Sequence, residues 1–121
     1  MTAIRILLVD DVKEVRQNLR TALTLCDGIE IVGEAANGLE ALRMVESLQP
    51  DAVLLDLEMP ILDGYEATRQ IKSSFPACRV IALTVHDYES AREKAKSAGV
   101  DAFLVKGAPV TTIVQTILKK E

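Results

Sequence analysis

Ala52-Val53-Leu54-Leu55-Asp56 is an apolar run that ends in a carboxylate, and this arrangement recurs along the chain. Residues 4–9 are followed by two aspartates, residues 80–83 by a threonine and residues 102–105 by a lysine. The polar residues that end the runs are Asp10, Asp11, Asp56, Thr84 and Lys106. Apolar runs without polar alternation are typical of parallel strands covered on both faces. Parallel strands end at one edge of their sheet, where open α/β sheets bind ligands, so the pattern predicts a single site.

The segments between the runs carry apolar residues at helical spacing, which predicts alternating β/α units. We expect a first helix that begins near Val12 and is closed by Gly28, and a second strand over 29–33. Further helices are expected at 39–48, at about 65–74, at about 88–98 and from Pro109 as the first helical residue. Right-handed crossovers place such helices on both faces of the sheet. The helix at 88–98 has mostly alanines as apolar residues, so we expect it to shift more easily than its neighbours.

Length and composition are those of one globular domain. The chain has 121 residues, 49% of them hydrophobic, which is enough for one packed core. A net charge of -4 and the lack of a basic run argue against direct nucleic-acid binding. No apolar stretch approaches the roughly 20 residues that cross a bilayer, and the start lacks the regions of a signal peptide. Because Cys26 and Cys78 have no metal-ligand spacing, we expect a reduced, cytoplasmic setting.

Asp10, Asp11 and Asp56 are the predicted acidic site. Carboxylates held together repel one another and favour a hard cation such as Mg²⁺. Asp56 would then be a nucleophile that becomes an aspartyl phosphate, with Thr84 and Lys106 as donors to phosphoryl oxygens. Each residue also has an ordinary interpretation, because an aspartate after a strand often caps a helix, a threonine can end a strand and a lysine can be solvated.

Four segments, taken in order, resemble the receiver domain of response regulators in two-component signalling. They are Leu8-Val9-Asp10-Asp11, residues 51–64 (Asp-Ala-Val-Leu-Leu-Asp-Leu-Glu-Met-Pro-Ile-Leu-Asp-Gly), Ile81-Ala82-Leu83-Thr84, and residues 98–106. The similarity spans essentially the whole chain and has the character of NarL/FixJ-type transcriptional regulators. It implies a flavodoxin-like (CheY-like) α/β fold, a five-stranded parallel sheet in the order 2-1-3-4-5 with five helices on both faces. Residues 1–121 would form a single receiver domain, which either stands alone or lacks a C-terminal effector domain.

The resemblance implies how the acidic residues act. Asp56 would accept a phosphoryl group from the phosphohistidine of a sensor histidine kinase, which makes the chain a phosphoprotein. Asp11 would bind Mg²⁺ directly, and Asp10 would share the same acidic pocket. Asp56 and the backbone carbonyl of Glu58 would complete the protein ligands of the metal.

The resemblance also implies how the switch works. Lys106 would contact one phosphoryl oxygen, and Thr84 would swing toward another and vacate space for Phe103 to rotate. Phe103 fits the aromatic switch position of the family, although core packing explains it as well. His86, the sole histidine, is expected at the rim rather than as a metal ligand or phosphoryl relay, and together with the Glu58 side chain it would influence how water reaches the phosphoryl group.

The turn after Lys106 departs from the family pattern. The family often has a proline after a cis peptide at this point, whereas here Gly107-Ala108-Pro109 follows. A cis bond before a residue other than proline costs about 2.5–4 kcal/mol. The geometry of this turn is therefore left open, although Gly107 tolerates unusual backbone shapes.

The implied output is a change in the surface of the fourth helix, the last strand and the last helix, which would control transcription. Phosphorylation would favour self-association as a homodimer, and DNA would be contacted only through an absent C-terminal helix-turn-helix domain. No membrane partner is expected, and catalysis would be limited to self-phosphorylation and autodephosphorylation.

Two other classes of function share part of this sequence pattern. A phosphatase that turns over external substrates would also form an aspartyl phosphate. Such enzymes carry a second aspartate as acid/base where Glu58 stands, and we see no cap insertion here. A flavodoxin-like cofactor binder would need a phosphate-cradling loop after the first strand. Asp10 and Asp11 would instead repel phosphate there.

Overall fold

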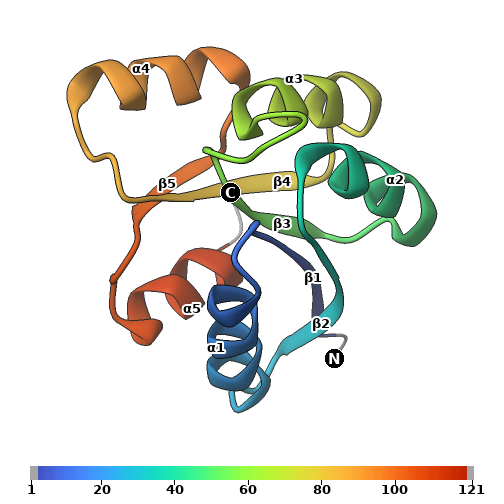
Figure 1. Ribbon diagram of the computed structural model, residues 1–121. Helices are drawn as coiled ribbons and strands as arrows, with labels where there is room; N and C mark the ends of the chain where they lie inside the picture. The colour runs from blue at the N-terminus through green and yellow to red at the C-terminus, as the bar shows by residue number, and fades with distance from the viewer. Residues whose placement is uncertain (1–2, 120–121) are drawn as a thin grey trace.

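The computed structural model describes residues 3–119 and shows a parallel five-stranded sheet between two layers of helices (Figure 1). The strands are β1 (Ile4–Val9), β2 (Ile29–Ala35), β3 (Ala52–Asp56), β4 (Arg79–Thr84) and β5 (Ala102–Val105). The helices are α1 (Lys13–Thr24), α2 (Gly38–Leu48), α3 (Gly64–Ser74), α4 (Glu89–Ala98) and α5 (Val110–Leu118). The sheet order is β2-β1-β3-β4-β5, which confirms the predicted fold class. No helix within the described range combines the length and apolar character needed to cross a bilayer.

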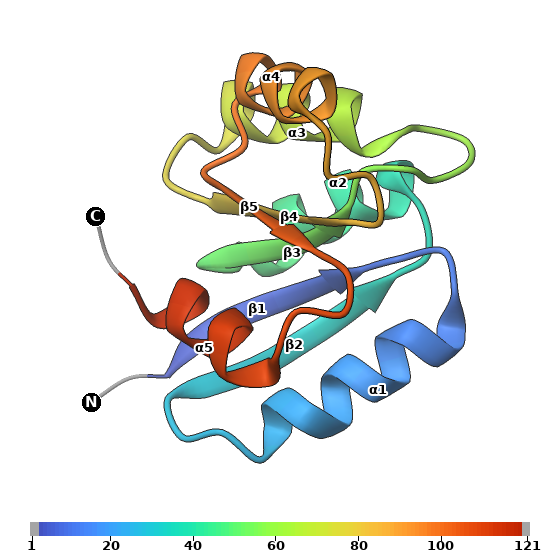
Figure 2. The ribbon, with the colours of Figure 1, turned by 90° about the vertical axis from the view of Figure 1, so that its left-hand side faces the viewer.

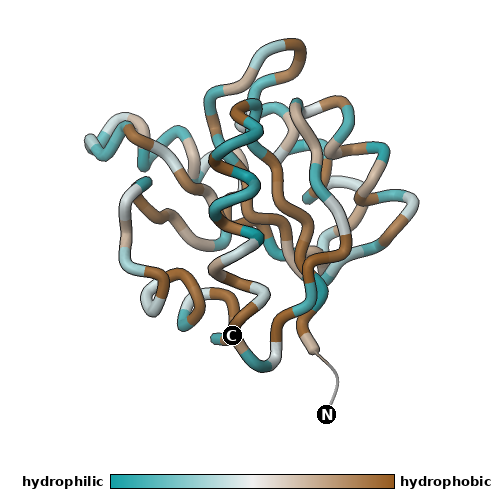
Figure 3. The backbone as a smooth tube through the Cα atoms, turned by 60° about the horizontal axis from the view of Figure 1, so that its bottom comes forward, coloured by the Kyte–Doolittle hydropathy of each residue, from teal (hydrophilic) through white to brown (hydrophobic). Residues whose placement is uncertain are grey.

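The two faces of the sheet are covered by different helices. α2, α3 and α4 lie on one face, and α1 and α5 lie on the other (Figures 1 and 2). Leu7 and Val9 belong to the core that includes α2 and α3, whereas Ile6 and Leu8 belong to the core that includes α1 and α5. Successive side chains of a strand point to opposite faces, so an uninterrupted apolar run fills both cores. In Figure 3 the central strands are mostly hydrophobic, while the helices alternate between hydrophilic and hydrophobic residues.

The register of the strands brings the predicted strand ends to one edge. β1 pairs with β3 so that Val9 lies opposite Leu55, and β3 pairs with β4 so that Asp56 lies opposite Leu83. β4 pairs with β5 up to Thr84, which lies opposite Val105. The residues that follow β1 and β5 therefore emerge beside the end of β3, as the sequence pattern predicted.

Two helix ends differ from the prediction. α1 ends at Thr24, with Leu25 as its C-cap, so the prediction that Gly28 closes this helix is wrong. Gly28 has a φ of 88°, and its carbonyl accepts a hydrogen bond from Ile4 N–H at 2.8 Å, so it shapes the turn into β2. The helical spacing of apolar residues continues past the end of the helix because Cys26 packs against the core from the turn. Pro109 is the N-cap of α5 and not its first helical residue.

α4 is held to the rest of the domain by small side chains, as predicted. Its buried residues are Ala91, Ala95 and Ala98. Two cation–π contacts flank these alanines: the Arg92 guanidinium lies 4.5 Å from the centre of the Phe103 ring, and Lys94 Nζ lies 4.2 Å from the centre of the Tyr65 ring. Because alanine buries little area, the small side chains hold the helix weakly, and these flanking contacts add to that hold. That α4 moves more easily than its neighbours stays a prediction.

Candidate functional site

Asp56 ends β3 in a nearly closed environment. The residue is 6% exposed. Its Oδ1 accepts a hydrogen bond from the backbone N–H of Glu58 at 3.0 Å, and its Oδ2 lies 3.2 Å from Lys106 Nζ. Burial is the largest influence on this carboxyl and raises its pKa above the ordinary value. The Glu58 N–H and the Lys106 charge lower the pKa of Asp56 again only in part, while the Asp10 charge adds to the increase.

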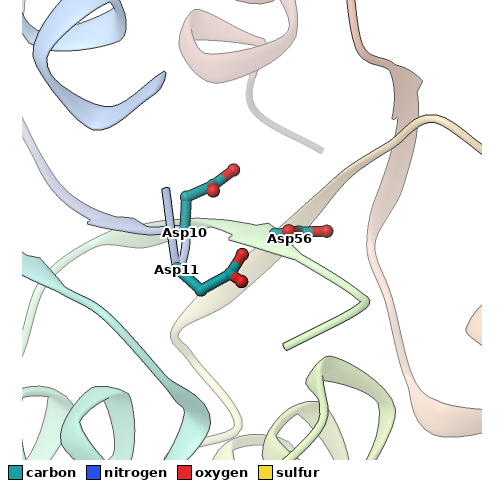
Figure 4. Close-up of side chains that lie close together, drawn as sticks. All are labelled: Asp10, Asp11 and Asp56. Carbon is teal, nitrogen blue, oxygen red and sulfur yellow. The ribbon is translucent and has the colours of Figure 1, made fainter. Parts of the chain in front are cut away.

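Asp10 and Asp11 follow β1 in the loop that leads to α1. Asp10 is buried, its Oδ1 accepts a hydrogen bond from Val12 N–H at 2.9 Å, and its Oδ2 lies 3.0 Å from Lys106 Nζ. Asp11 is exposed. One carboxylate oxygen from each of Asp10, Asp11 and Asp56 lies within 4.8 Å of the other two. Figure 4 shows the three side chains projecting to the same side, so the fold brings together the carboxylates that the sequence predicted.

The Lys106 ammonium lies between two of these carboxylates and contacts both Asp10 and Asp56. Burial lowers the pKa of Lys106, but the hydrogen bond to Asp10 and the charges of Asp56 and Asp10 outweigh it, so the net pKa is raised. The lysine therefore stays charged at neutral pH. It is well placed to meet an anion that approaches Asp56, because its Nζ lies within 3.2 Å of that carboxylate.

The donor set fits a small divalent cation. Mg²⁺ takes oxygen ligands at about 2.0–2.1 Å in an octahedral array, so that opposite ligands are about 4.2 Å apart. Any three ligands of an octahedron include at least two adjacent pairs, whose oxygens are about 2.9 Å apart. Carboxylate oxygens within 4.8 Å of one another must therefore close by up to about 2 Å when the ion binds. Lys106 supplies one positive charge against three carboxylates, and the remaining negative charge favours a cation. That the Glu58 carbonyl is a further ligand stays a prediction.

Thr84, Glu58 and His86 form a polar group beside the acidic residues. Thr84 is 1% exposed and its Oγ1 accepts a hydrogen bond from His86 N–H at 3.2 Å. The Thr84 hydroxyl donates a longer bond of 3.4 Å to Glu58 Oε1, which also lies 2.9 Å from His86 Nε2. The His86 side chain is 42% exposed, in keeping with the rim position expected for it. The structure thus joins the predicted hydroxyl donor to the two residues expected to control water access.

Phe103 and the turn after Lys106 lie on β5 and just beyond it. Phe103 pairs with Ala82 across the strands and is half-buried against the core that contains Ala82 and Ala95. The Arg92 guanidinium lies over the Phe103 ring, a contact that the sequence did not suggest. No peptide bond in residues 3–119 is cis, and Gly107 has a φ of 93°, so the glycine shapes the turn where the family often has proline.

A tight loop joins Asp56 to α3. Gly64 packs so closely against the end of β3 that a Cβ on it would lie 2.4 Å from the Asp56 carbonyl oxygen. Asp63 caps α3, because its Oδ1 accepts a hydrogen bond from Glu66 N–H at 2.9 Å. Ile61 is 76% exposed with a φ of 72°, a left-handed conformation that is unfavourable for a β-branched residue. Only glycine at position 64 permits this close approach of helix and strand end.

Sequence reasoning missed two features beside the predicted site. A cavity of about 670 Å³ lies between the β3–α3 loop and α4, and Asp11, Glu58, Tyr65 and Tyr88 are among its lining residues. Arg16 Nη1 donates a 2.6 Å hydrogen bond to the Asp10 carbonyl. Tyr65 and Tyr88 form no sequence motif, because Tyr65 lies in α3 and Tyr88 caps α4, and the two meet only after folding. The only available signal for Arg16 was its place in the first turns of the helix that follows Asp10.

Comparison with known proteins agrees with this geometry. Residues 6–118 match the response regulator receiver domain family. The response regulator GacA of Pseudomonas viridiflava is 39% identical over 114 residues, which are 94% of this chain and 53% of that protein. The transcriptional regulatory protein YhcZ of Bacillus subtilis is 40% identical over 112 residues, 93% of this chain and 52% of its own length. The chain therefore spans about half the length of the curated relatives it matches.

Solved structures give the same assignment. The signal receiver domain of the response regulator NarL from Mycobacterium tuberculosis has a TM-score of 0.93 and 31% identity, with 98% of this chain and 95% of that chain covered. The CheX–CheY–BeF3–Mg complex from Borrelia burgdorferi has a TM-score of 0.89 and 26% identity, with 98% and 92% covered. Together with the clustered strand-end residues, the family match over residues 6–118 shows that the chain belongs to the response regulator receiver domain family.

Proposed function

We propose that this chain is a phosphorylation switch in which Asp56 accepts a phosphoryl group from the phosphohistidine of a sensor histidine kinase. The observation that carries the proposal is the placement of the Asp56 carboxylate at the end of β3, between two further carboxylates and the Lys106 ammonium. Burial raises the pKa of this carboxyl and leaves it few solvent partners, while Lys106 keeps a positive charge beside it. A carboxylate in this setting is a suitable nucleophile for phosphorus once its negative neighbours are offset.

The transfer forms one bond and breaks one. An Asp56 carboxylate oxygen forms the new O–P bond, and the P–N bond to the kinase histidine breaks. The electron pair of that P–N bond stays on the imidazole nitrogen, which leaves the histidine free to take a proton from solvent. Lys106, already 3.2 Å from Asp56 Oδ2, then contacts a phosphoryl oxygen and offsets its charge.

Asp10, Asp11, Asp56 and the backbone carbonyl of Glu58 are the proposed ligands of Mg²⁺. The bound ion supplies positive charge that offsets the repulsion between the Asp56 carboxylate and the anionic phosphoryl group. The carboxylate oxygens within 4.8 Å of one another support this assignment. Further support comes from the similar Borrelia burgdorferi structure, which is described as a complex that contains CheY with BeF3 and magnesium.

Thr84 and Phe103 are the proposed switch residues. A phosphoryl group on Asp56 adds about −1.5 to −2 charge and strong acceptor oxygens, which compete with Glu58 for the Thr84 hydroxyl. The present bond from Thr84 Oγ1 to Glu58 Oε1 is long, at 3.4 Å, so it is readily exchanged. Movement of Thr84 makes room beside β5 for Phe103, and the altered surface of α4, β5 and α5 then meets a partner or a second copy of the chain.

The proposed output is control of transcription in the cytoplasm. The curated relatives are about twice as long as the matched segment and include a transcriptional regulatory protein. We infer that residues 1–121 are a single receiver domain and that a helix-turn-helix domain, when present C-terminal to it, makes the DNA contact. The receiver domain itself carries a net charge of -4, which does not favour direct DNA binding.

The test is phosphorylation by acetyl phosphate with Mg²⁺, followed by intact mass spectrometry. We expect wild type to gain one phosphoryl group and Asp56→Asn to gain none. The matched control is Asp51→Asn, which changes the aspartate just before β3 rather than the one that ends it, and should be phosphorylated like wild type. Labelling of Asp56→Asn would contradict the proposal, and repeated turnover of a simple phosphate ester would favour the phosphatase class instead.

A further inference from the structure

The loop that carries Asp10 and Asp11 is held by a contact outside the acidic site. Asp10 is nearly fully buried, so each of its polar groups needs a partner. Its N–H donates to the Ala35 carbonyl at 3.1 Å, and its carboxylate oxygens meet Val12 N–H and Lys106. Only the backbone carbonyl is left, and α1 begins too late in the chain to supply a helical N–H to it.

Arg16 supplies that missing partner and holds the loop at a second point. Its Nη1 donates to the Asp10 carbonyl at 2.6 Å, and its backbone N–H donates to the Val12 carbonyl at 3.2 Å. The Asp10 carbonyl belongs to the peptide group that joins Asp10 to Asp11. The Arg16 side chain therefore fixes the peptide group just before Asp11, whereas the bond to the Val12 carbonyl is the first backbone bond of α1 and does not depend on the side chain. The Asp11 side chain itself is exposed.

Glu34 on β2 orients the guanidinium. Glu34 Oε1 lies 3.1 Å from Arg16 Nε, and Glu34 Oε2 lies 2.6 Å from Arg20 Nε. The hydrogen bond from Arg20 is the largest influence on this carboxyl, and with Arg16 it outweighs burial and lowers the pKa of Glu34, so the carboxylate stays charged at neutral pH. The Arg16 side chain is only 14% exposed. The planar guanidinium donates to the Asp10 carbonyl and to Glu34 at the same time, which the single nitrogen of a lysine does less well.

We propose that Arg16 is a positioning residue that keeps Asp11 within reach of Asp10 and Asp56, and that Glu34 holds Arg16 in place for this purpose. The inference rests on the proposed function, because it assigns Asp11 to Mg²⁺. Without Arg16, the buried Asp10 carbonyl loses its partner and the loop shifts to find water. Asp11 then spends less time beside the other two carboxylates, and the affinity for Mg²⁺ falls. Partners that orient metal ligands typically change affinity by about 10–100-fold.

The experiment measures the Mg²⁺ dissociation constant of the unphosphorylated 121-residue chain by amide NMR titration with magnesium chloride. We expect Arg16→Met to raise the dissociation constant at least about tenfold. Arg16→Lys, which keeps the charge but not the fork, should raise it by a smaller factor of about threefold or more. The matched control is Arg20→Met, which removes the other cation from Glu34 but leaves the Asp10 carbonyl bonded, and should stay within about twofold of wild type.

The outcomes separate this inference from the proposed function. Wild-type affinity in both Arg16 variants would overturn the positioning role, as would an equal loss in Arg20→Met. Arg16→Lys decides the question if Arg16→Met does not fold, as judged by its circular dichroism. Asp11→Asn is measured in parallel. If Asp11→Asn binds Mg²⁺ like wild type, the proposed metal site fails; if it binds weakly while the Arg16 variants do not, only the present inference fails.

Discussion

Replacing Gly64 by alanine should displace the end of the strand that carries Asp56. A Cβ on Gly64 would lie 2.4 Å from the Asp56 carbonyl oxygen and 2.5 Å from Leu57 Cα. Both atoms belong to the backbone, so no flexible side chain can turn away to relieve the overlap. Gly64 N–H also donates to the Leu57 carbonyl at 2.9 Å, which ties the first turn of α3 to this segment. The added methyl group must therefore push α3 away from β3.

The expected cost follows from two opposing effects. Overpacking of a buried site costs about 1–3 kcal/mol, and the backbone contacts at Gly64 place this substitution at the upper end of that range. Alanine is favoured over glycine in a helix interior by about 0.8–1 kcal/mol; Gly64 is the first residue of α3, so this preference offsets at most that much of the cost. The net loss of unfolding free energy should be about 2 kcal/mol.

Urea unfolding followed by circular dichroism at fixed pH measures this change. The slope of unfolding free energy against urea concentration should stay the same as in wild type. Gly33→Ala is the matched control, because a Cβ there meets only side-chain ends, at 3.1–3.3 Å. It should cost less stability than Gly64→Ala, because side-chain ends can give way by a few tenths of an ångström and backbone atoms cannot. Phosphorylation by acetyl phosphate should also slow in Gly64→Ala but not in Gly33→Ala. A Gly64→Ala protein as stable and as readily phosphorylated as wild type would refute the reasoning.

Three further predictions concern residues away from the acidic site. Lys72→Met should lower the unfolding free energy by about 2 kcal/mol, because Lys72 Nζ donates to two backbone carbonyls and a carboxylate at 2.9–3.1 Å. The control Arg69→Met, on the same helix, removes only an exposed ion pair and should cost less than about 0.5 kcal/mol in the same urea assay. Ile61→Asn should raise stability by about 1 kcal/mol, since asparagine tolerates the left-handed backbone and the isoleucine side chain is mostly exposed; a lower urea midpoint would count against strain at this position. Burial raises the pKa of the Cys78 thiol to about 11, so this thiol stays protonated at pH 8. Iodoacetamide should therefore modify the half-buried Cys26 first, as measured by peptide mass spectrometry, and faster labelling of Cys78 would contradict its burial.

Most of the fold could be predicted because the sequence repeats one local pattern. The apolar runs of β3 and β4 lack polar alternation, and the structure buries both of their faces. The error at Gly28 has a local cause, since helical spacing continues into a turn whose residues still pack on the core. Periodicity reports which side chains are buried, and it does not report whether the backbone between them is hydrogen-bonded as a helix.

The residues of the acidic site could be named in advance for a different reason. Asp10, Asp56 and Lys106 each lie at the C-terminal end of a strand, and parallel strands bring such ends together whatever their separation in sequence. No comparable rule predicts the contacts that long side chains make around the site. Arg16 reaches the Asp10 carbonyl, and Arg92 covers Phe103, through long side chains whose direction depends on neighbours from other elements.

The amino-acid sequence by itself determined the order of strands and helices, the polar residues at the strand ends and the expected chemistry of three carboxylates with a lysine. The tertiary structure alone decided which oxygen atoms approach within 4.8 Å, that one ammonium contacts both Asp10 and Asp56, and that Arg16 donates a hydrogen bond to the Asp10 carbonyl. The physical reason is that local patterns depend on burial and backbone geometry over a few neighbouring residues. Distances between charged groups depend instead on strand register, loop shape and side-chain packing across the whole domain.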